Sequence, residues 1–529
     1  MTPLGLSDIL LLAAGFWLAR KVARRILHPN TRETKLKGPP RDSWLFGLSR
    51  KLADAGLQYE QWAAEYGPVF QVPVGFGRRK IILCDPKAVN HFSSMERTIY
   101  VKTKMHRTML SHLFGRGIQW AEGETHKRQR KALTPAFSNS AVRSLTSVFY
   151  DSAYKLRGYW DASIDRCAIL DVENWMNRIA LDSIGIGGFS HDFRSLDGEY
   201  STVAEAFDAL SFEGTGTFSS LVLILGTQLP FLAHLPTARN RILGNLRRTM
   251  NAIANDLLEK TKKSHEKRTP VSNENSDKSI ISLLLKAQEE DGEHHMNGTE
   301  VVAQMNVLLV AGYETTAVSL TWALIELARN PEKQEKLRQE LRQFGTTDPT
   351  WDQLVSGLPY LDAVVLEILR LHPPLEGTTR EAIIDDVIPL GEPVTTPSGD
   401  VVSNIIVAKG SVVSVSIRCM NRSNPLWGMN AKEFQPERWL TLPDDYIRAK
   451  QIQGHRHLIS FQNGPRTCLG KSFALAELKA VLSVLIRSFT FEFPNGPETK
   501  IETHPGIINR PKVVGQAAAN VPMKVGRVD

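Results

Sequence analysis

A single cysteine near the end of the chain has the surroundings of a metal ligand. Cys468 lies in the segment FQNGPRTCLG, residues 461–470, whose Gly-Pro pair favours a tight turn. The helix-forming run KSFALAELKAVLSVLI follows at once, so the sulfur would lie near the free amide groups of a helix start, which stabilise a thiolate. A lone cysteine is more often a small buried apolar residue. Gly470, however, leaves a flat surface without a side chain, and the segment therefore predicts a thiolate beneath a planar cofactor such as haem.

A second candidate site lies in the apolar run VLLVAGYETTAVSLTWALIELA, residues 307–328. The run is too apolar for a surface helix, yet it contains Gly312, Glu314 and Thr315, and glycine costs about 1 kcal/mol relative to alanine inside a helix. One interpretation is a core helix whose threonine hydroxyls bond back to carbonyls. The other is a helix that opens beside Gly312 to leave room for oxygen, with Glu314 and Thr315 relaying protons.

Two further motifs carry charge. LEILRLHPP places Glu367 and Arg370 one helical turn apart, a spacing that usually means a solvated ion pair. Because the preceding run YLDAVVL is apolar, the pair would be removed from water, and loss of either charge would then destabilise the fold. The segment GETHKRQRKALTPAF, residues 123–137, concentrates Lys and Arg, which is typical of a solvated helix face.

Together these motifs resemble the cytochrome P-450 superfamily of haem-thiolate monooxygenases, and the fungal microsomal members in particular. The resemblance covers almost the whole chain, from the proline-rich hinge to about residue 515. The haem-binding loop of the family is matched at Phe461, Gly464, Arg466, Cys468 and Gly470. This implies haem b as the cofactor, Cys468 as its axial thiolate, Arg466 as a propionate partner and Phe461 as a residue packed against the sulfur.

The resemblance also assigns roles to the charged pair and the central helix. Glu367 and Arg370 would form a structural triad with Arg438 of FQPERW, behind the haem. In the central helix an acid followed by threonine relays protons in the family, so Glu314 and Thr315 are the expected catalytic residues. The family more often has Asp at the first position. The residues of this helix expected beside the cofactor are Ala311 and Gly312.

Propionate contacts are expected from the basic helix as well. The family carries a Trp and an Arg spaced four apart there, and these places are His126 and Arg130 in this chain, so the Trp is absent. Imidazole can still donate to a carboxylate. Arg380 in GTTREA aligns with a further propionate contact. The remaining basic residues of this helix would face outward, where an acidic reductase could dock: Lys127, Arg128 and Lys131.

These sites require a scaffold, and the pattern predicts a mainly α fold with a minor β-sheet region in one large domain, residues 48–529. Residues 67–83 alternate in polarity and predict a hairpin, and helical periodicity dominates from about 140 to 370. A polar loop is expected at 262–279. Short β-branched runs return between 385 and 418, and a helix and a strand-rich tail follow Cys468. The resemblance implies the cytochrome P-450 fold.

The N-terminus predicts a membrane anchor. An apolar stretch at 3–19 is followed by Arg20, Lys21, Arg24 and Arg25, the reverse of the order in a cleavable signal peptide. We expect a signal anchor over residues 1–27, in the endoplasmic reticulum membrane with the remainder cytosolic, and a proline-rich hinge over 28–47. The alternative is an interfacial or buried amphipathic helix. The apolar segment 218–236 is either a kinked core helix or a lid that touches the bilayer.

Composition limits the partners. The net charge is +8, but the chain has no long basic run and no nucleic-acid motif, so a membrane surface or an acidic protein is favoured over nucleic acid. Its four cysteines, at 84, 167, 419 and 468, lack zinc-site spacings. No glycine-rich dinucleotide fingerprint follows a strand, so the resemblance implies an NADPH-dependent flavoprotein reductase as the source of electrons.

The resemblance implies insertion of one oxygen atom from O₂ into a hydrophobic small molecule, such as a terpenoid or another secondary metabolite. The pocket would be lined by residues 100–120, 375–379 and 506–508 together with Val307, Leu308 and Ala311, which are mainly apolar. Two alternatives stay open. One is a haem-thiolate isomerase or dehydratase that needs no external electrons, and the other is a haem sensor without catalytic activity.

Overall fold

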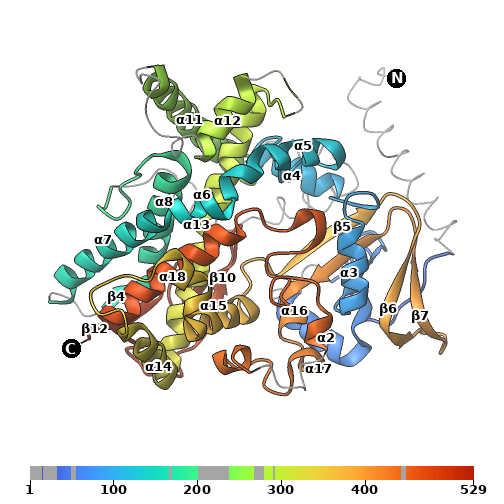
Figure 1. Ribbon diagram of the computed structural model, residues 1–529. Coiled ribbons are helices and arrows are strands. Elements are labelled where there is room, and N and C mark those ends of the chain that lie inside the picture. The colour runs from blue at the N-terminus through green and yellow to red at the C-terminus, as the bar shows by residue number, and fades with distance from the viewer. Residues whose placement is uncertain are drawn as a thin grey trace, which may run out of the picture.

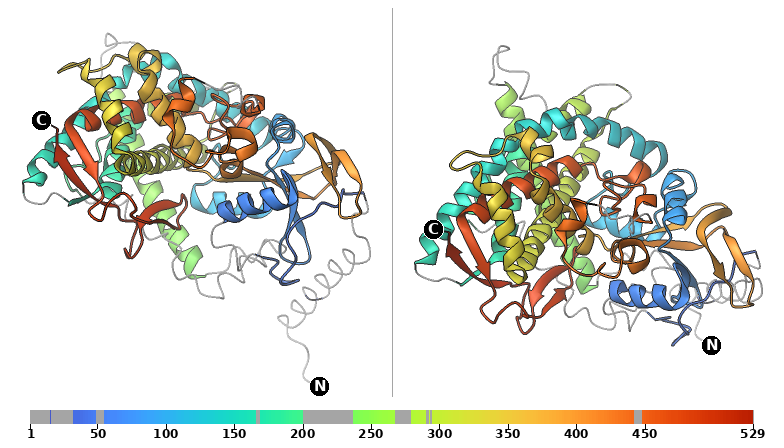
Figure 2. Two further views of the ribbon diagram at one scale, coloured as in Figure 1. Left: turned by 90° about the horizontal axis from the view of Figure 1, so that it is seen from below. Right: turned by 60° about the horizontal axis from the view of Figure 1, so that its bottom comes forward.

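The computed structural model describes most of the chain, namely residues 15, 32–48, 55–165, 169–199, 237–266, 279–289, 292, 294–441 and 448–528. Over these residues the fold is mainly helical with a smaller sheet region, in one domain, as predicted. The views in Figures 1 and 2 agree that the long helices gather on one side of the molecule and the mixed sheet, with the β6–β7 hairpin, on the other.

The helical side is built around one long central helix, α13 (Gly298–Arg329). It begins with a capping box between Asn297 and Glu300, and most of its side chains are buried, because α8, α11, α15 and α18 pack around it. The other helices are α2 (Ala55–Tyr66), α3 (Pro86–Ser94), α4 (Lys104–Leu113), α5 (Gly123–Leu133), α6 (Asn139–Ser144), α7 (Thr146–Ile164), α8 (Val172–Phe189), α11 (Ala238–Glu266), α12 (Ile280–Glu289), α14 (Pro331–Arg342), α15 (Pro359–Leu371), α16 (Ile417–Asn421), α17 (Asn424–Trp427) and α18 (Lys471–Ser488).

The sheet side contains a five-stranded sheet in the order β1-β2-β8-β5-β3, with β2 and β8 parallel and the other neighbours antiparallel. Its strands are β1 (Val69–Pro73), β2 (Arg79–Leu83), β3 (Tyr100–Val101), β5 (Gly377–Ala382) and β8 (Val412–Ser416). The β6 (Asp386–Thr395) and β7 (Val401–Val407) hairpin lies on the same side. Two further small sheets lie against the helices: β10 (Ile501–His504) pairs with β11 (Arg510–Val513), and β12 (Pro522–Arg527) pairs with both β4 (Ile169–Asp171) and β9 (Phe489–Glu492).

Most of the expected elements are present. The hairpin predicted at 67–83 is confirmed by the antiparallel pair β1–β2, in which Val69 lies opposite Leu83. The strands expected at 385–418 are also present, as are the helix and the strands after Cys468. The loop predicted from residue 262 was placed too early, because α11 continues to Glu266. Residues 267–278 lie outside the described residues.

The structure bears only in part on the membrane predictions. Except for residue 15, the anchor 1–27 lies outside the described residues, as does the segment 218–236. The described part of the hinge packs on the sheet, since the Gln71 amide donates to the Lys37 carbonyl at 2.9 Å. Among the described residues, α13 has the length and hydropathy to span a membrane, but 78% of its most apolar window is buried, as expected of a core helix.

Candidate functional site

The segment 461–470 folds into a compact loop that ends in α18. The Cys468 amide donates to the Phe461 carbonyl at 2.8 Å, which closes the loop. Gly464 has a φ of +63°, and a Cβ at this position would lie 2.6 Å from the Ser93 carbonyl oxygen. The glycine is therefore required both by its backbone conformation and by the close approach of α3. This confirms the predicted turn, although Gly464 does not line the cavity described next.

A cavity between the helical and sheet sides brings most of the predicted residues together. Its empty space, including the part open to solvent, is about 1370 Å³. The lining contains residues from the loop, from α5, from α13 and from β5: His126, Arg130, Ala311, Gly312, Thr315, Arg380, Phe461, Arg466, Cys468 and Gly470. Val307, Leu308 and residue 375 also line it, as expected, whereas residues 506–508 do not.

The thiol of Cys468 faces this cavity. The side chain is exposed to the cavity although it lies deep in the protein, because the cavity side of the sulfur is not covered by protein atoms. Burial raises the pKa of the thiol, while the Gly470 amide and the charges of Arg130 and Lys471 act in the opposite direction. A metal ion would therefore be needed to hold it as a thiolate at neutral pH.

Gly470 tests whether a flat cofactor fits here. A Cβ added to it would approach Phe137 only to 3.7 Å, an ordinary van der Waals contact. The protein itself therefore places no steric demand for glycine at this position, which lines the cavity. A ligand lying against the loop would explain why a residue without a side chain stands here. Gly470 therefore fits a planar haem.

Basic side chains form one rim of the cavity. This basic rim consists of Lys102, His126, Arg130, Arg380 and Arg466. Arg130 donates to the Thr467 carbonyl at 2.8 Å, which ties α5 to the cysteine loop. Burial lowers the pKa of His126 to about 3, so the imidazole is neutral and adds a hydrogen-bond donor rather than a charge. A rim of this composition fits the two propionates of haem.

Two carboxylates that the sequence did not indicate hold the rim in place. Glu96 pairs with Arg380 at 2.7 Å, and the Arg380 Nε has no hydrogen-bond partner among the described residues. Glu122 pairs with Lys102 at 3.1 Å and also with Arg466. Burial, followed by the charge of Arg466, lowers the pKa of Lys102 to about 7. No spacing links these residues in the sequence, so only the fold could reveal them.

The α13 wall of the cavity differs from the expected opened helix. The helix runs without a break through Gly312, and the Thr315 hydroxyl donates back to the Ala311 carbonyl at 2.7 Å. The expectation of a helix opened beside Gly312 was therefore wrong for this structure. A Cβ at Gly312 would lie 2.6 Å from Ile184, so the glycine allows α8 to pack closely on α13. Ile184 also lines the cavity, a contact that the sequence did not indicate.

Glu314 lies on another face of α13 and does not line the cavity. Its carboxylate is buried and faces Arg510 of β11, with 3.4 Å between Oε1 and the guanidinium. Arg510 also approaches Glu173 of α8, at 3.6 Å. The structure thus separates the two residues expected to relay protons: Thr315 lines the cavity, and Glu314 belongs to a buried ion-pair cluster beside it.

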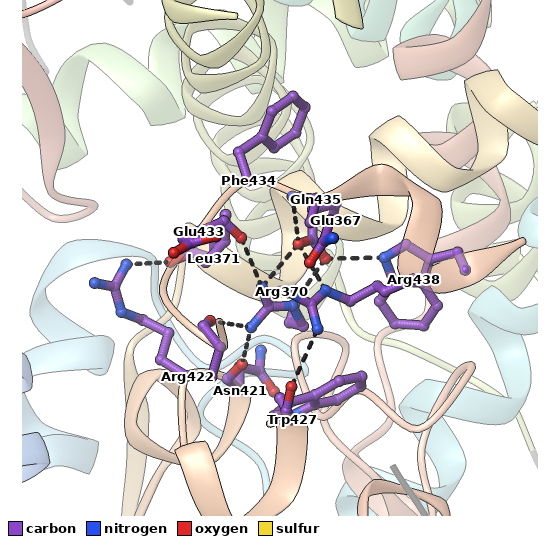
Figure 3. Close-up of polar contacts among 12 residues, drawn as sticks. Glu367, Arg370, Leu371, Asn421, Arg422, Trp427, Glu433, Phe434, Gln435 and Arg438 are labelled. Carbon is purple, nitrogen blue, oxygen red and sulfur yellow. Dashed lines mark hydrogen bonds and ion pairs between the residues drawn. The ribbon is translucent and has the colours of Figure 1, made fainter. Parts of the chain in front are cut away.

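The predicted charged triad comes together on α15 and the segment that follows α17 (Figure 3). The Glu367 carboxylate accepts hydrogen bonds from Arg370 Nε at 2.8 Å and from Arg438 Nε at 2.9 Å, and all three side chains are fully buried. The Trp439 ring nitrogen and the Gln435 amide each donate to the same carboxylate at 2.9 Å. Burial opposes ionisation, but both arginines outweigh it and lower the pKa of Glu367.

Comparisons with known proteins show what this chain is similar to. A family model described as cytochrome P-450 matches residues 37–515. The chain is similar to the cytochrome P-450 monooxygenases claP and claQ of Ampulloclitocybe clavipes, with 54% and 53% identity over 100% of each chain. It is also similar to cytochrome P-450 monooxygenase 205 of Postia placenta, with 34% identity over 92% of this chain and 91% of the relative.

Proposed function

Because this chain belongs to the cytochrome P-450 family and is a monooxygenase whose cofactor is haem b with a cysteine thiolate ligand, we propose that the haem lies in the described cavity with Cys468 as its axial ligand. The observation that carries this assignment is the thiol itself, which is deep in the protein yet uncovered toward the cavity. The bare surface at Gly470 and the basic rim support the same placement.

The side chains of the cavity are proposed to have different roles. When bound, haem with a thiolate ligand supplies cleavage of the O–O bond. Arg130, Arg380 and Arg466 would hold the propionates by charge, and neutral His126 would add a hydrogen bond in the place of the family's Trp. Thr315 holds a proton at Oγ1 and donates it into the cavity when the hydroxyl turns away from the Ala311 carbonyl. Glu314 acts on this proton transfer only indirectly, since its carboxylate faces Arg510 and not the cavity.

The substrate is proposed to be a hydrophobic small molecule, such as a terpenoid or another secondary metabolite. Val307, Leu308 and Ile118 give the cavity an apolar wall, and Gln119 is a polar side chain beside them. The names of the fungal relatives give no substrate, so the apolar lining carries this part of the proposal. A panel in which only water-soluble polar compounds were oxidised would contradict it.

Electrons are proposed to come from an NADPH-dependent flavoprotein reductase, and residues 1–27 to anchor the protein in the endoplasmic reticulum membrane. Lys127 of α5 is more than half exposed, and Lys131 is also exposed, so both can meet an acidic partner. Arg128 differs from that expectation, because it is bonded to Glu300 of α13 at 2.5 Å. The apolar N-terminal stretch with basic residues after it supports the anchor.

The difference spectrum of the reduced, carbon-monoxide-bound protein tests the assignment. We expect the red-shifted Soret band of a haem thiolate in the wild type and its loss in Cys468→Ser. Cys84→Ser is the matched control, since Cys84 is a buried free cysteine outside the cavity, and it should keep the band. A band that survives in Cys468→Ser would overturn the proposal. Product formation that requires NADPH and reductase would then exclude the isomerase alternative.

A further inference from the structure

A second buried glutamate lies next to the cavity without the partners that a buried charge needs. Glu477 is in the middle of α18 and is fully buried, and neither of its carboxyl oxygens has a hydrogen-bond partner among the described residues. The hydroxyl of Ser183 on α8 is also buried without a partner. Buried polar atoms are nearly always paired with protein or with ordered water, so these three oxygens need an explanation.

Thr316 of α13 completes the group. The hydroxyls of three other residues on this helix donate to the carbonyl four residues earlier, at 2.7, 2.9 and 2.8 Å for Thr315, Ser319 and Thr321. Thr316 makes no such bond, and its hydroxyl faces Glu477, as does that of Ser183. Three helices, α8, α13 and α18, thus each turn one polar side chain toward the same buried point.

This group lies in the wall of the cavity. Thr316 itself lines the cavity, and so do its neighbour Thr315, Ile184 beside Ser183, and Leu478 beside Glu477. Thr316 is therefore the one member of the group that both faces the carboxyl and lines the cavity. We name Glu477, Ser183 and Thr316 the α18 cluster.

The ionisation state of the carboxyl follows from its surroundings. Burial raises the pKa of Glu477 to about 8, and the hydroxyls of Ser183 and Thr316 lower it by less. No charged side chain among the described residues contributes to this pKa, including those of α7, α13, α14 and α15, which pack on α18. Glu477 therefore carries a proton at neutral pH. A polar site with several unpaired oxygens is also where a buried water molecule binds in proteins.

We propose that the α18 cluster is a proton-holding site that binds buried water and exchanges protons with the cavity through the Thr316 hydroxyl. In one exchange the Glu477 carboxyl passes its proton to a bound water molecule, this water passes a proton to the Thr316 oxygen, and the Thr316 hydroxyl releases its own proton into the cavity. The carboxylate left behind regains a proton from water by the reverse path, so no other reactant is consumed. Only the use of these protons in oxygen chemistry rests on the function proposed above.

Infrared spectroscopy of the haem-containing protein measures the protonation of this carboxyl directly. We expect a band of a protonated carboxyl that disappears as the pH rises through about 8 in the wild type, since exposed carboxyls ionise far below this pH. Glu477→Gln should remove the band, and Glu492→Gln, a change at an exposed glutamate of β9, should leave it. A wild-type spectrum with no such band, or a band that persists in Glu477→Gln, would overturn the proposal.

Exchange with heavy water tests the route through Thr316. The band should shift on transfer to heavy water, and this exchange should slow at least tenfold in Thr316→Val but stay near the wild-type rate in Thr316→Ser. Equal rates in wild type and Thr316→Val would show that protons do not pass through this hydroxyl. Because the carbon-monoxide spectrum is recorded separately, a failure of the α18 cluster is distinguishable from a failure of the Cys468 assignment.

Discussion

Glu367 and Glu477 are two fully buried glutamates on the packed helices α15 and α18, and their surroundings are opposite. Glu367 is surrounded by two arginines, an indole nitrogen and a backbone amide, and its pKa is lowered. Glu477 faces two hydroxyls and no charge, and its pKa is raised to about 8. Burial alone thus does not set the protonation of a carboxyl. The partners decide whether it serves as a fixed charge in the structure or as an exchangeable acid.

The largest expected effect comes from Glu367→Gln. Loss of the carboxylate leaves the Arg370 and Arg438 charges buried without a counter-charge, a change that typically costs about 3–5 kcal/mol. This is a large fraction of the stability of a folded domain. We therefore expect a much lower unfolding temperature and poor haem incorporation, measured by thermal unfolding and by the haem-to-protein ratio.

Glu437→Gln is the control for this experiment. Glu437 lies next to Arg438 but is partly exposed, and it pairs with Lys336 at 2.9 Å. An exposed ion pair contributes about 0–1 kcal/mol, so this variant should behave nearly as the wild type. If both variants lost stability equally, the special position of Glu367 in the comparison would be refuted.

The two glutamates also predict opposite pH dependences of stability. Because the folded-state pKa of Glu367 is lowered, its contribution is present at neutral pH and is lost on acidification. Glu477 has a raised pKa, so its contribution is complete below about pH 4 and is lost as the pH rises toward about 8, at about 1.4 kcal/mol per pH unit.

Denaturant unfolding of the wild type and Glu477→Gln measures the second dependence. Glutamine does not ionise. The free energy of unfolding of the variant, relative to that of the wild type, should therefore rise by about 1.4 kcal/mol for each pH unit between about 5 and 8. Parallel pH curves for the two proteins would mean that Glu477 has an ordinary pKa, and the contrast with Glu367 would fail.

The sequence revealed one of these glutamates and not the other, for physical reasons. Glu367 belongs to a motif whose arginine partner is one helical turn away, and a second motif supplies Arg438, so the order of the motifs was informative. Glu477 lies in the run FALAELKAVL, where an acid looks like an exposed helix residue. Its burial depends on α7, α13, α14 and α15 packing around α18, and this long-range arrangement leaves no local pattern.

The same limit applies to the cavity. The cysteine loop could be predicted because turn, ligand and helix start are contiguous in the chain. Glu96 and Glu122, which hold the basic rim, come from separate elements with no common spacing. For Glu314, adjacency to Thr315 predicted a common site, but neighbouring residues on a helix point about 100° apart, and Glu314 turns to Arg510 instead.

The smallest expected effect tests the packing of α8 on α13 beside the α18 cluster. A Cβ at Gly312 would lie 2.6 Å from Ile184, the residue after Ser183. In Gly312→Ala, overpacking should cost about 1–3 kcal/mol, and the higher helix propensity of alanine should return about 1 kcal/mol. We therefore expect a modest loss of stability. Ile184→Val should recover part of that loss in the double variant. The matched control is Gly158→Ala on α7, where nothing lies within 4 Å and a gain of about 0.5–1 kcal/mol is expected.

The infrared band of Glu477 connects this packing to the comparison of the two glutamates. If α8 moves away from α13 in Gly312→Ala, bulk solvent reaches the carboxyl, the cost of ionising it falls, and its pKa should shift downward from about 8. The ion pairs of Glu367 do not involve α8, so its ionisation should be unaffected. If the Glu477 pKa stayed constant while the stability fell, the close contact of α8 with α13 would not be what keeps this carboxyl protonated.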